Sequence, residues 1–194
     1  MITGRIGQER GFTMVELMLA VAIGMIVVGM AMGGVPGMIK SSKADGGLAT
    51  AAAGLRAARE MAISSRRNVR VTFGTNTVIN TRVEYCASPC TPATTVVRTT
   101  TLEGRVVFRE PLGITPDTDD GFGNTSTSGI NFGTLVPAMF TTDGSFINSN
   151  GDVLNGTIFL GVTNDVITTR AISIFGPTGA MRLWKWDGRA WVEV

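Results

Sequence analysis

One stretch of this chain constrains its fold more than any other, because residues 12–39 contain a single ionisable side chain, Glu16. A helix needs roughly 20 apolar residues to cross the hydrocarbon core of a bilayer, so we expect this run to form a transmembrane helix. A lone carboxylate in such a segment costs roughly 2.5–3.5 kcal/mol on insertion and usually marks a functional position. Glu16 is therefore the first candidate functional residue.

The residues before the apolar run indicate its orientation. Residues 1–11 are short, polar and net positive, with Arg5 and Arg10 against Glu9. The positive-inside bias keeps such a leader in the cytoplasm and sends the rest of the chain outward. Pro36, with glycines on both sides, predicts a kink or a loosened turn within the run.

Helical periodicity resumes between residues 43 and 67, where apolar residues recur at spacings of three and four. The stripe consists of Leu48, Ala52, Leu55, Ala58, Ala62 and Ile63. Off the stripe lie Arg56, Arg59, Glu60, Arg66 and Arg67. Because the stripe is narrow and flanked by charge, we expect it to pack on a β domain rather than on lipid. Arg56 and Glu60 are expected to pair weakly on the exposed face, and the other arginines to be solvated.

From residue 68 onward the apolar period changes to two, and Gly, Thr, Asn and Val become frequent, which is typical of a β domain with many turns. Asp187-Gly188 predicts a two-residue hairpin turn, and residues 111–128 predict a long surface loop or a disordered insertion. The expected strands cover residues 69–73, 78–85, 96–108, 130–132, 139–140, 146–147, 157–162, 166–175, 180–186 and 190–194. The expected fold class is α+β: a long N-terminal α-helix, transmembrane and then amphipathic, packed on a C-terminal antiparallel β-rich globular domain.

Residue types limit the chemistry that this chain can perform. It has no histidine, which excludes Ser-His-Asp and Cys-His catalysis and removes the commonest transition-metal ligand. No other set of residues forms a credible active site, so we predict no enzyme, no metal and no cofactor. Cys86 and Cys90 fit one small disulfide loop in an exported domain, with a pair of free thiols as the alternative. The acidic stretch 117–120 lacks the spacing of a calcium loop and favours a solvated turn.

Three features coincide at the N-terminus: a basic leader that ends in Gly11, the segment from Phe12 to Glu16, and the apolar helix. Cleavage between Gly11 and Phe12 would create an α-amino group four residues before Glu16. Glu16 of a neighbouring subunit could neutralise that amine where the dielectric constant is low. An ordinary signal peptide cut near residues 31–33 is the alternative, but its apolar run would be too long and Glu16 would stay unexplained.

The heptapeptide 11–17 (GFTMVEL) resembles the class III leader junction of type IV prepilins and type II secretion pseudopilins. The resemblance implies that prepilin peptidase cuts after Gly11 and N-methylates Phe12, and that Glu16 guides assembly. Residues 55–63 (LRAAREMAI) and 66–71 (RRNVRV) resemble the helix-to-strand junction of the GspH/FimT minor pseudopilins. The implied regions are a prepilin leader (1–11), a transmembrane and filament-core helix (12–39), an amphipathic helix (40–67) and a β-rich, pilin-like periplasmic domain (68–194).

The resemblance also implies a function and a set of partners. The chain would be a minor pseudopilin of a type II secretion or type IV pilus filament, made as a single-pass inner-membrane precursor with its N-terminus in the cytoplasm. Its partners would be other pilin-like subunits, prepilin peptidase and an inner-membrane assembly platform. The sequence does not distinguish secretion from pilus machines, because members of both share the same N-terminus.

The C-terminal hairpin supports an alternative function. Three tryptophans lie close to Arg182, Lys185 and Arg189, and such a combination can bind DNA through stacking and phosphate contacts. Some FimT-type minor pilins use a C-terminal Gly-Arg-x-Arg segment in DNA uptake, and residues 179–182 (GAMR) lack its first arginine. The pattern therefore favours cross-strand aromatic pairing that closes the domain over DNA binding.

Overall fold

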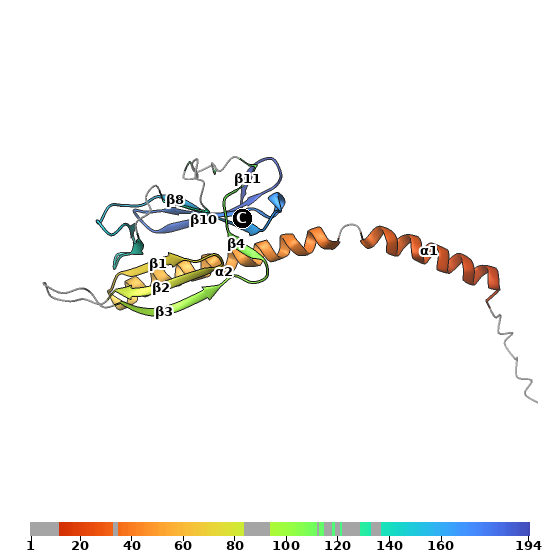
Figure 1. Ribbon diagram of the computed structural model, residues 1–194, viewed down its shortest axis with the longest axis horizontal. Coiled ribbons are helices and arrows are strands. Elements are labelled where there is room, and N and C mark those ends of the chain that lie inside the picture. The colour runs from red at the N-terminus through yellow and green to blue at the C-terminus, as the bar shows by residue number, and fades with distance from the viewer. Residues whose placement is uncertain are drawn as a thin grey trace, which may run out of the picture. The chain divides into compact units, whose positions relative to one another are not determined.

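The structure is a computed structural model that describes residues 12–32, 35–83, 94–111, 113–114, 118, 121, 129–132 and 137–194. The chain divides into two compact units, with the boundary between Ile39 and Lys40. Helix α1 (Met14–Met32) belongs to the first unit, and α2 (Val35–Ser65) begins there and continues into the second (Figure 1). Pro36 occupies the first turn of α2, where its missing N–H is tolerated. Within the described residues, no helix has both the length and the apolar character needed to cross a membrane.

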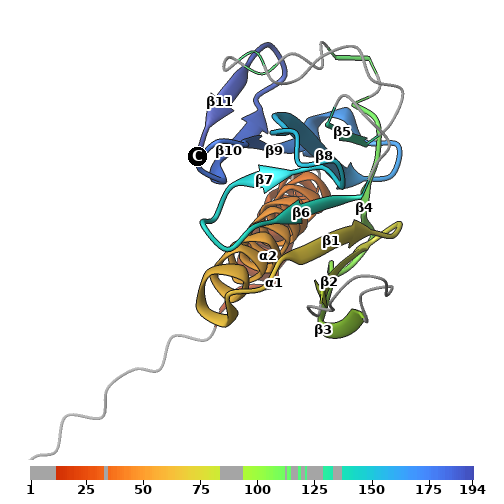
Figure 2. The same ribbon diagram turned by 90° about the vertical axis from the view of Figure 1, so that its left-hand side faces the viewer.

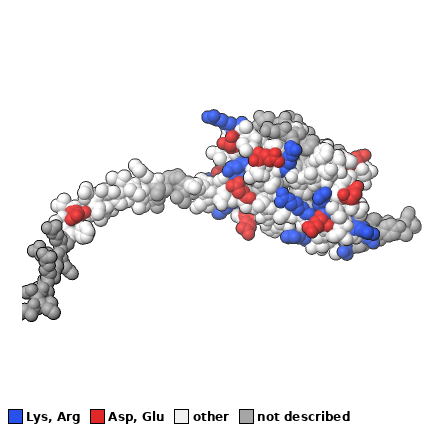
Figure 3. All heavy atoms as spheres, turned by 180° about the vertical axis from the view of Figure 1, so that it is seen from behind, with Lys and Arg blue, Asp and Glu red and all other residues white. Residues whose placement is uncertain are grey.

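Helix α1 is apolar around its whole circumference. Side chains are exposed at every position from Phe12 to Met30, including Leu17, Ile23 and Val27. On the face shown in Figure 3, the helix is white apart from one acidic side chain. A helix that is hydrophobic on all sides is stable only when lipid or protein covers it, so α1 has the surface of a buried element.

The described strands of the second unit form two antiparallel sheets. The first sheet has the order β3-β2-β1-β6-β7, and the second has the order β11-β10-β9-β8-β4, with β5 also paired to β8. The strands of the first are β1 (Val69–Phe73), β2 (Thr77–Val83), β3 (Thr94–Thr101), β6 (Ala138–Phe140) and β7 (Phe146–Ile147). Those of the second are β4 (Val106–Phe108), β5 (Ile130–Asn131), β8 (Gly156–Val162), β9 (Arg170–Phe175), β10 (Ala180–Trp186) and β11 (Trp191–Glu193).

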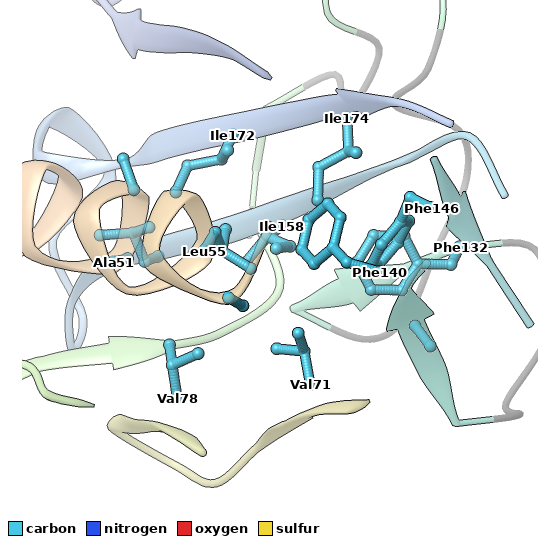
Figure 4. Packing of buried hydrophobic residues seen from close by; sticks show 14 of the residues in the cluster. Ala51, Leu55, Val71, Val78, Phe132, Phe140, Phe146, Ile158, Ile172 and Ile174 are labelled. Carbon is cyan, nitrogen blue, oxygen red and sulfur yellow. The ribbon is translucent and has the colours of Figure 1, made fainter. Parts of the chain in front are cut away.

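Helix α2 packs between these two sheets, which confirms the expected α+β class. Figures 2 and 4 place β1 and β2 on one side of the helix and β8 and β9 on the other. Leu55 lies between Val71 of the first sheet and Ile172 of the second, and all three side chains are buried in one core (Figure 4). The helix approaches β4 closely, because a Cβ added at Gly47 would lie 2.7 Å from a methyl carbon of Val106.

The predicted apolar stripe of α2 is confirmed except at its end. Its first five members are fully or almost fully buried, whereas Ile63 is 42% exposed. Ala44 is also buried and extends the stripe toward the N-terminus, and Ala51 is buried within it. Adjacent helical side chains point about 100° apart, and at this end of the helix only Ala62 faces the core, whereas Ala51 and Ala52 both do so nearer its middle.

Two strand predictions were wrong in detail. The run 96–108 is divided between β3 and β4, which belong to different sheets and are separated by Gly104 at φ +71°. The run 166–175 begins with a 3-10 turn (Val166–Thr168) before β9. In each run the change of structure falls at a short polar interruption, residues 103–105 and residues 168–170, and the apolar residues on both sides of it favoured one continuous strand. Strand β2 ends at Val83, and the remainder of the run 78–85 lies outside the described residues.

The C-terminal hairpin is present, but its turn has four residues instead of two. Trp186 pairs with Trp191, and the N–H of Asp187 donates to the carbonyl oxygen of Ala190 at 3.1 Å. The Asp187 carboxylate accepts the backbone N–H groups of Arg189 and Ala190 at 2.7 and 2.8 Å. These two bonds close the wider turn and lower the pKa of Asp187. The bond from the N–H of Ala190 lowers the pKa most, and the bond from the N–H of Arg189 comes second.

Helix α2 ends in a Schellman motif that has an arginine at the position usually taken by glycine. The N–H of Arg67 donates to Ala62 O at 3.3 Å, the N–H of Arg66 donates to Ile63 O at 3.4 Å, and Arg66 has φ +50°. A left-handed conformation is strained for a residue with a Cβ.

Arg66→Gly is therefore expected to raise the free energy of unfolding of the Lys40–Val194 unit by about 0.5–1 kcal/mol. The midpoint of urea denaturation measures the change. Arg56→Gly is the matched control, because Arg56 is an exposed mid-helix residue and its replacement should cost about 1 kcal/mol. A lower midpoint for Arg66→Gly would show that the arginine contributes more than its strained backbone costs.

Candidate functional site

The N-terminal segment begins with an exposed aromatic residue and a capped helix. Phe12 precedes α1 and is 81% exposed. Thr13 caps the helix, because its Oγ1 accepts the N–H of Glu16 at 3.3 Å while its carbonyl oxygen accepts the N–H of Leu17 at 3.1 Å. Glu16 thus lies in the first helical turn, where the helix dipole stabilises a negative charge.

Thr13 is a helix cap that the sequence reasoning missed. The spacing Thr-x-x-Glu at positions 13 and 16 is the signature of a capping box, and it could have been found in the sequence. The Thr13 hydroxyl accepts the Glu16 amide hydrogen, and the Glu16 side chain stays exposed. Within the described residues, Glu16 forms no ion pair.

Several predicted site residues cannot be placed. Gly11 lies outside the described residues, as do Cys86 and Cys90. The acidic stretch 117–120 is described only at Thr118, which is buried. The expected cleavage point, disulfide and solvated acidic turn therefore stay predictions.

The basic residues of the C-terminal hairpin do not form one cluster. Arg182 is 59% exposed, and its Nε lies 3.9 Å from Oε1 of Glu193 on the neighbouring strand. Lys185 is an odd number of residues further along β10, so it points to the opposite face of the sheet. Arg189 lies in the turn between the two strands. The two faces and the turn thus separate the three positive charges.

The tryptophans of the same hairpin do lie together, as expected for cross-strand pairing. The rings of Trp186 and Trp191 are 5.5 Å apart and inclined by 65°, and Phe159 lies 5.9 Å from Trp191. Trp184 is buried in the same cluster and donates its Nε1–H to Ser173 Oγ at 2.9 Å. The predicted aromatic closure of the hairpin is confirmed, and it contributes a second apolar core on this face of the second sheet.

A buried arginine connects α2 to the start of β9. Arg170 is fully buried, and its Nε forms an ion pair with Oδ1 of Asp45 at 2.6 Å. Its Nη1 donates to the carbonyl oxygens of Ile167 and Thr169, each at 3.0 Å, and its Nη2 donates to Ser41 Oγ at 3.0 Å. Residues 41–45 of α2 are thereby attached to the second sheet. The sequence reasoning missed Arg170, although a charged residue inside an apolar strand-like run is a detectable signal.

Arg59 is the second arginine whose role was predicted wrongly. It was expected on a solvated face, but it is half-buried, and its Nε donates to Gly144 O at 3.2 Å and to Thr178 O at 3.1 Å. Gly144 and Gly179 both have positive φ, and a Cβ at Gly179 would collide with the Gly144 carbonyl oxygen. Glycine is required at position 179, because the two turns approach each other closely around the Arg59 side chain.

The turn that contains Gly144 is itself held by local hydrogen bonds. The Asp143 carboxylate accepts hydrogen bonds from the Thr141 hydroxyl and from the backbone N–H and hydroxyl of Ser145. The bond from Thr141 contributes most, and together they lower the pKa of Asp143 to about 2. Arg56 and Glu60, on the exposed side of α2, form no ion pair, so the pairing expected between them is absent.

The comparisons with known proteins concern the N-terminus. Residues 7–32 match the family model of the prokaryotic N-terminal methylation motif. No curated protein and no solved structure matches the chain. The match supports a type IV pilin-like protein whose leader is a substrate of prepilin peptidase. The motif also suggests assembly with other pilins.

Proposed function

We propose that this chain is a minor pseudopilin of the GspH/FimT type, which joins a type II secretion or type IV pilus filament through its N-terminal helix. One observation carries the proposal. Helix α1 lies within the methylation motif, exposes an apolar surface on all sides and has one carboxylate, Glu16, in its first turn. Such a surface needs a cover of lipid before assembly and of neighbouring helices afterwards.

The proposed assembly step depends on the charge at the start of α1. Cleavage after Gly11 frees the α-amino group of Phe12, and a positive charge there is unfavourable beside the helix N-terminus. Glu16 of an adjacent subunit neutralises that amine once both are removed from water. A buried carboxylate or ammonium without a partner costs several kcal/mol, so the pair favours a subunit that is seated in register.

The second unit supports the assignment to a minor pseudopilin less directly. The segment 55–63, which resembles the GspH/FimT junction, contains Arg59, and Arg59 donates hydrogen bonds to the turns at Gly144 and Thr178. An arginine at this point of the helix joins it to both sheets, since one turn follows β6 and the other follows β9. The proposed role of this unit is to face the periplasm and contact other pilin-like subunits.

The N-terminus of the mature protein tests the proposal. We expect mass spectrometry of the protein from a strain with prepilin peptidase to find a chain that begins at Phe12 and carries one methyl group on its amine. A strain without the peptidase should yield a chain that retains residues 1–11. Gly11→Val in the first strain is the matched control and should also retain them. A mature chain that begins near residues 31–33 would identify an ordinary signal peptide and exclude the proposed function.

A further inference from the structure

A groove of about 490 Å³ lies on the second unit, between the C-terminal half of α2 and the turn that leads into β10. Its walls include two arginines, Arg56 and Arg59, one carboxylate, Glu60, and two apolar side chains, Ile63 and Met181. This volume is within the range of ligand sites in proteins. The described residues that line the groove therefore combine a net positive charge with an apolar wall.

Arg59 is preorganised for binding. The carbonyl oxygens of Gly144 and Thr178 hold its Nε, which fixes the plane of the guanidinium group. Among the described residues, neither Nη atom of Arg59 has a hydrogen-bond partner. A guanidinium that is fixed at one nitrogen, with two others unoccupied, offers paired N–H donors in the geometry that a carboxylate accepts.

The other side chains of the groove define what can accompany the carboxylate. Arg56 lies on the same side of the helix, about one turn before Arg59, and is exposed without an ion pair. Ile63, which left the buried stripe of α2, is 42% exposed at the groove, and Met181 is half-buried beside it. A ligand that satisfies both features has a negative group next to an apolar side chain. Glu60 at the same groove disfavours the dense negative charge of a nucleic-acid backbone.

We propose that this groove binds an extended peptide segment of a neighbouring filament subunit, with a carboxylate between Arg56 and Arg59 and an apolar side chain against Ile63 and Met181. The identity of this partner rests on the proposed function, whereas the chemistry of the groove does not. Ala180 also lines the groove, and its small, exposed side chain leaves the groove open. A larger residue at position 180 would fill the groove without changing its charge.

The test uses the full chain in an uncharged detergent and a fluorescein-labelled octapeptide amide that alternates glutamate and leucine. Fluorescence anisotropy should give a Kd about tenfold or more below that of the same peptide with glutamine in place of glutamate. Arg56→Gln and Ala180→Phe should each weaken binding of the glutamate peptide about tenfold. Arg105→Gln removes an exposed arginine that lies outside the groove and should leave binding unchanged.

The outcomes separate the groove from the proposed function. Equal binding of the two peptides, or unchanged binding by both groove variants with circular dichroism intact, would overturn the assignment. Salt-sensitive displacement of the peptide by duplex DNA, lost in Arg56→Gln, would make the groove a nucleic-acid site and overturn it too. A mature N-terminus at Phe12 without selective peptide binding would reject the groove alone. Selective binding by a chain with another N-terminus would reject the pseudopilin and retain the groove.

Discussion

Arg170→Ala is expected to lower the free energy of unfolding of the Lys40–Val194 unit by about 3–5 kcal/mol, measured from urea denaturation. The Arg170 side chain is fully buried, and four hydrogen-bonding partners surround it. Its removal leaves a cavity, leaves the Ile167 carbonyl oxygen without its donor, and leaves the Thr169 carbonyl oxygen with the Trp186 N–H as its donor. Small domains are stable by only about 5–15 kcal/mol, so a loss of this size is a large fraction of the total.

Replacement of Asp45, the ion-pair partner of Arg170, should lower the free energy of unfolding less than replacement of Arg170. The Asp45 side chain is 49% exposed, and asparagine keeps a side-chain oxygen that can accept the Nε–H of Arg170. Asp45→Asn is therefore expected to cost less than Arg170→Ala, about 1–3 kcal/mol. Arg182→Ala is the matched control for losing an arginine, because the exposed Arg182–Glu193 pair should contribute less than about 1 kcal/mol. In hydrogen exchange, Arg170→Ala should also expose the amides of residues 41–45. A loss below 1 kcal/mol would mean that the buried arginine is dispensable to this fold.

Glu16→Gln is expected to reduce incorporation of the protein into filaments at least about thirtyfold, because removing one partner of a buried charge pair costs about 2–5 kcal/mol. The substitution keeps the size of the side chain and leaves the Thr13 cap intact, since Thr13 bonds the backbone of residue 16. The ratio of protein in sheared filaments to protein in membranes, from immunoblots, measures the effect.

Two controls distinguish assembly from storage in the membrane. Glu16→Asp retains the charge and should assemble better than Glu16→Gln. The membrane pool of Glu16→Gln should not fall, because an uncharged side chain lowers the cost of inserting the apolar run. If filaments incorporate Glu16→Gln or Glu16→Ala as readily as the unsubstituted chain, the proposed assembly step loses its basis.

The sequence predicted those features that depend on neighbouring residues. The apolar period of α2 identified its buried face as far as Ala62, and the alternation around Trp184 and Trp191 predicted the aromatic hairpin. The helix cap at Thr13 was equally readable, because its hydrogen bond joins residues three positions apart. The hairpin turn was predicted too short, since a dipeptide does not reveal that the Asp187 carboxylate bonds two later amides.

The sequence by itself determined the helix and strand periods, the exposed apolar helix with its single carboxylate and the methylation motif that contains it. All of these depend on residues within a few positions of one another. Only the tertiary structure decided that the run 96–108 enters two sheets, that Arg170 is buried and that Arg59 joins two turns. Arg170 and Asp45 are 125 positions apart, and Arg59 and Thr178 are 119 apart. The local sequence does not distinguish an arginine that donates hydrogen bonds to solvent from one that donates to a distant carbonyl oxygen. The roles of these two arginines therefore follow from the packing of the sheets on α2.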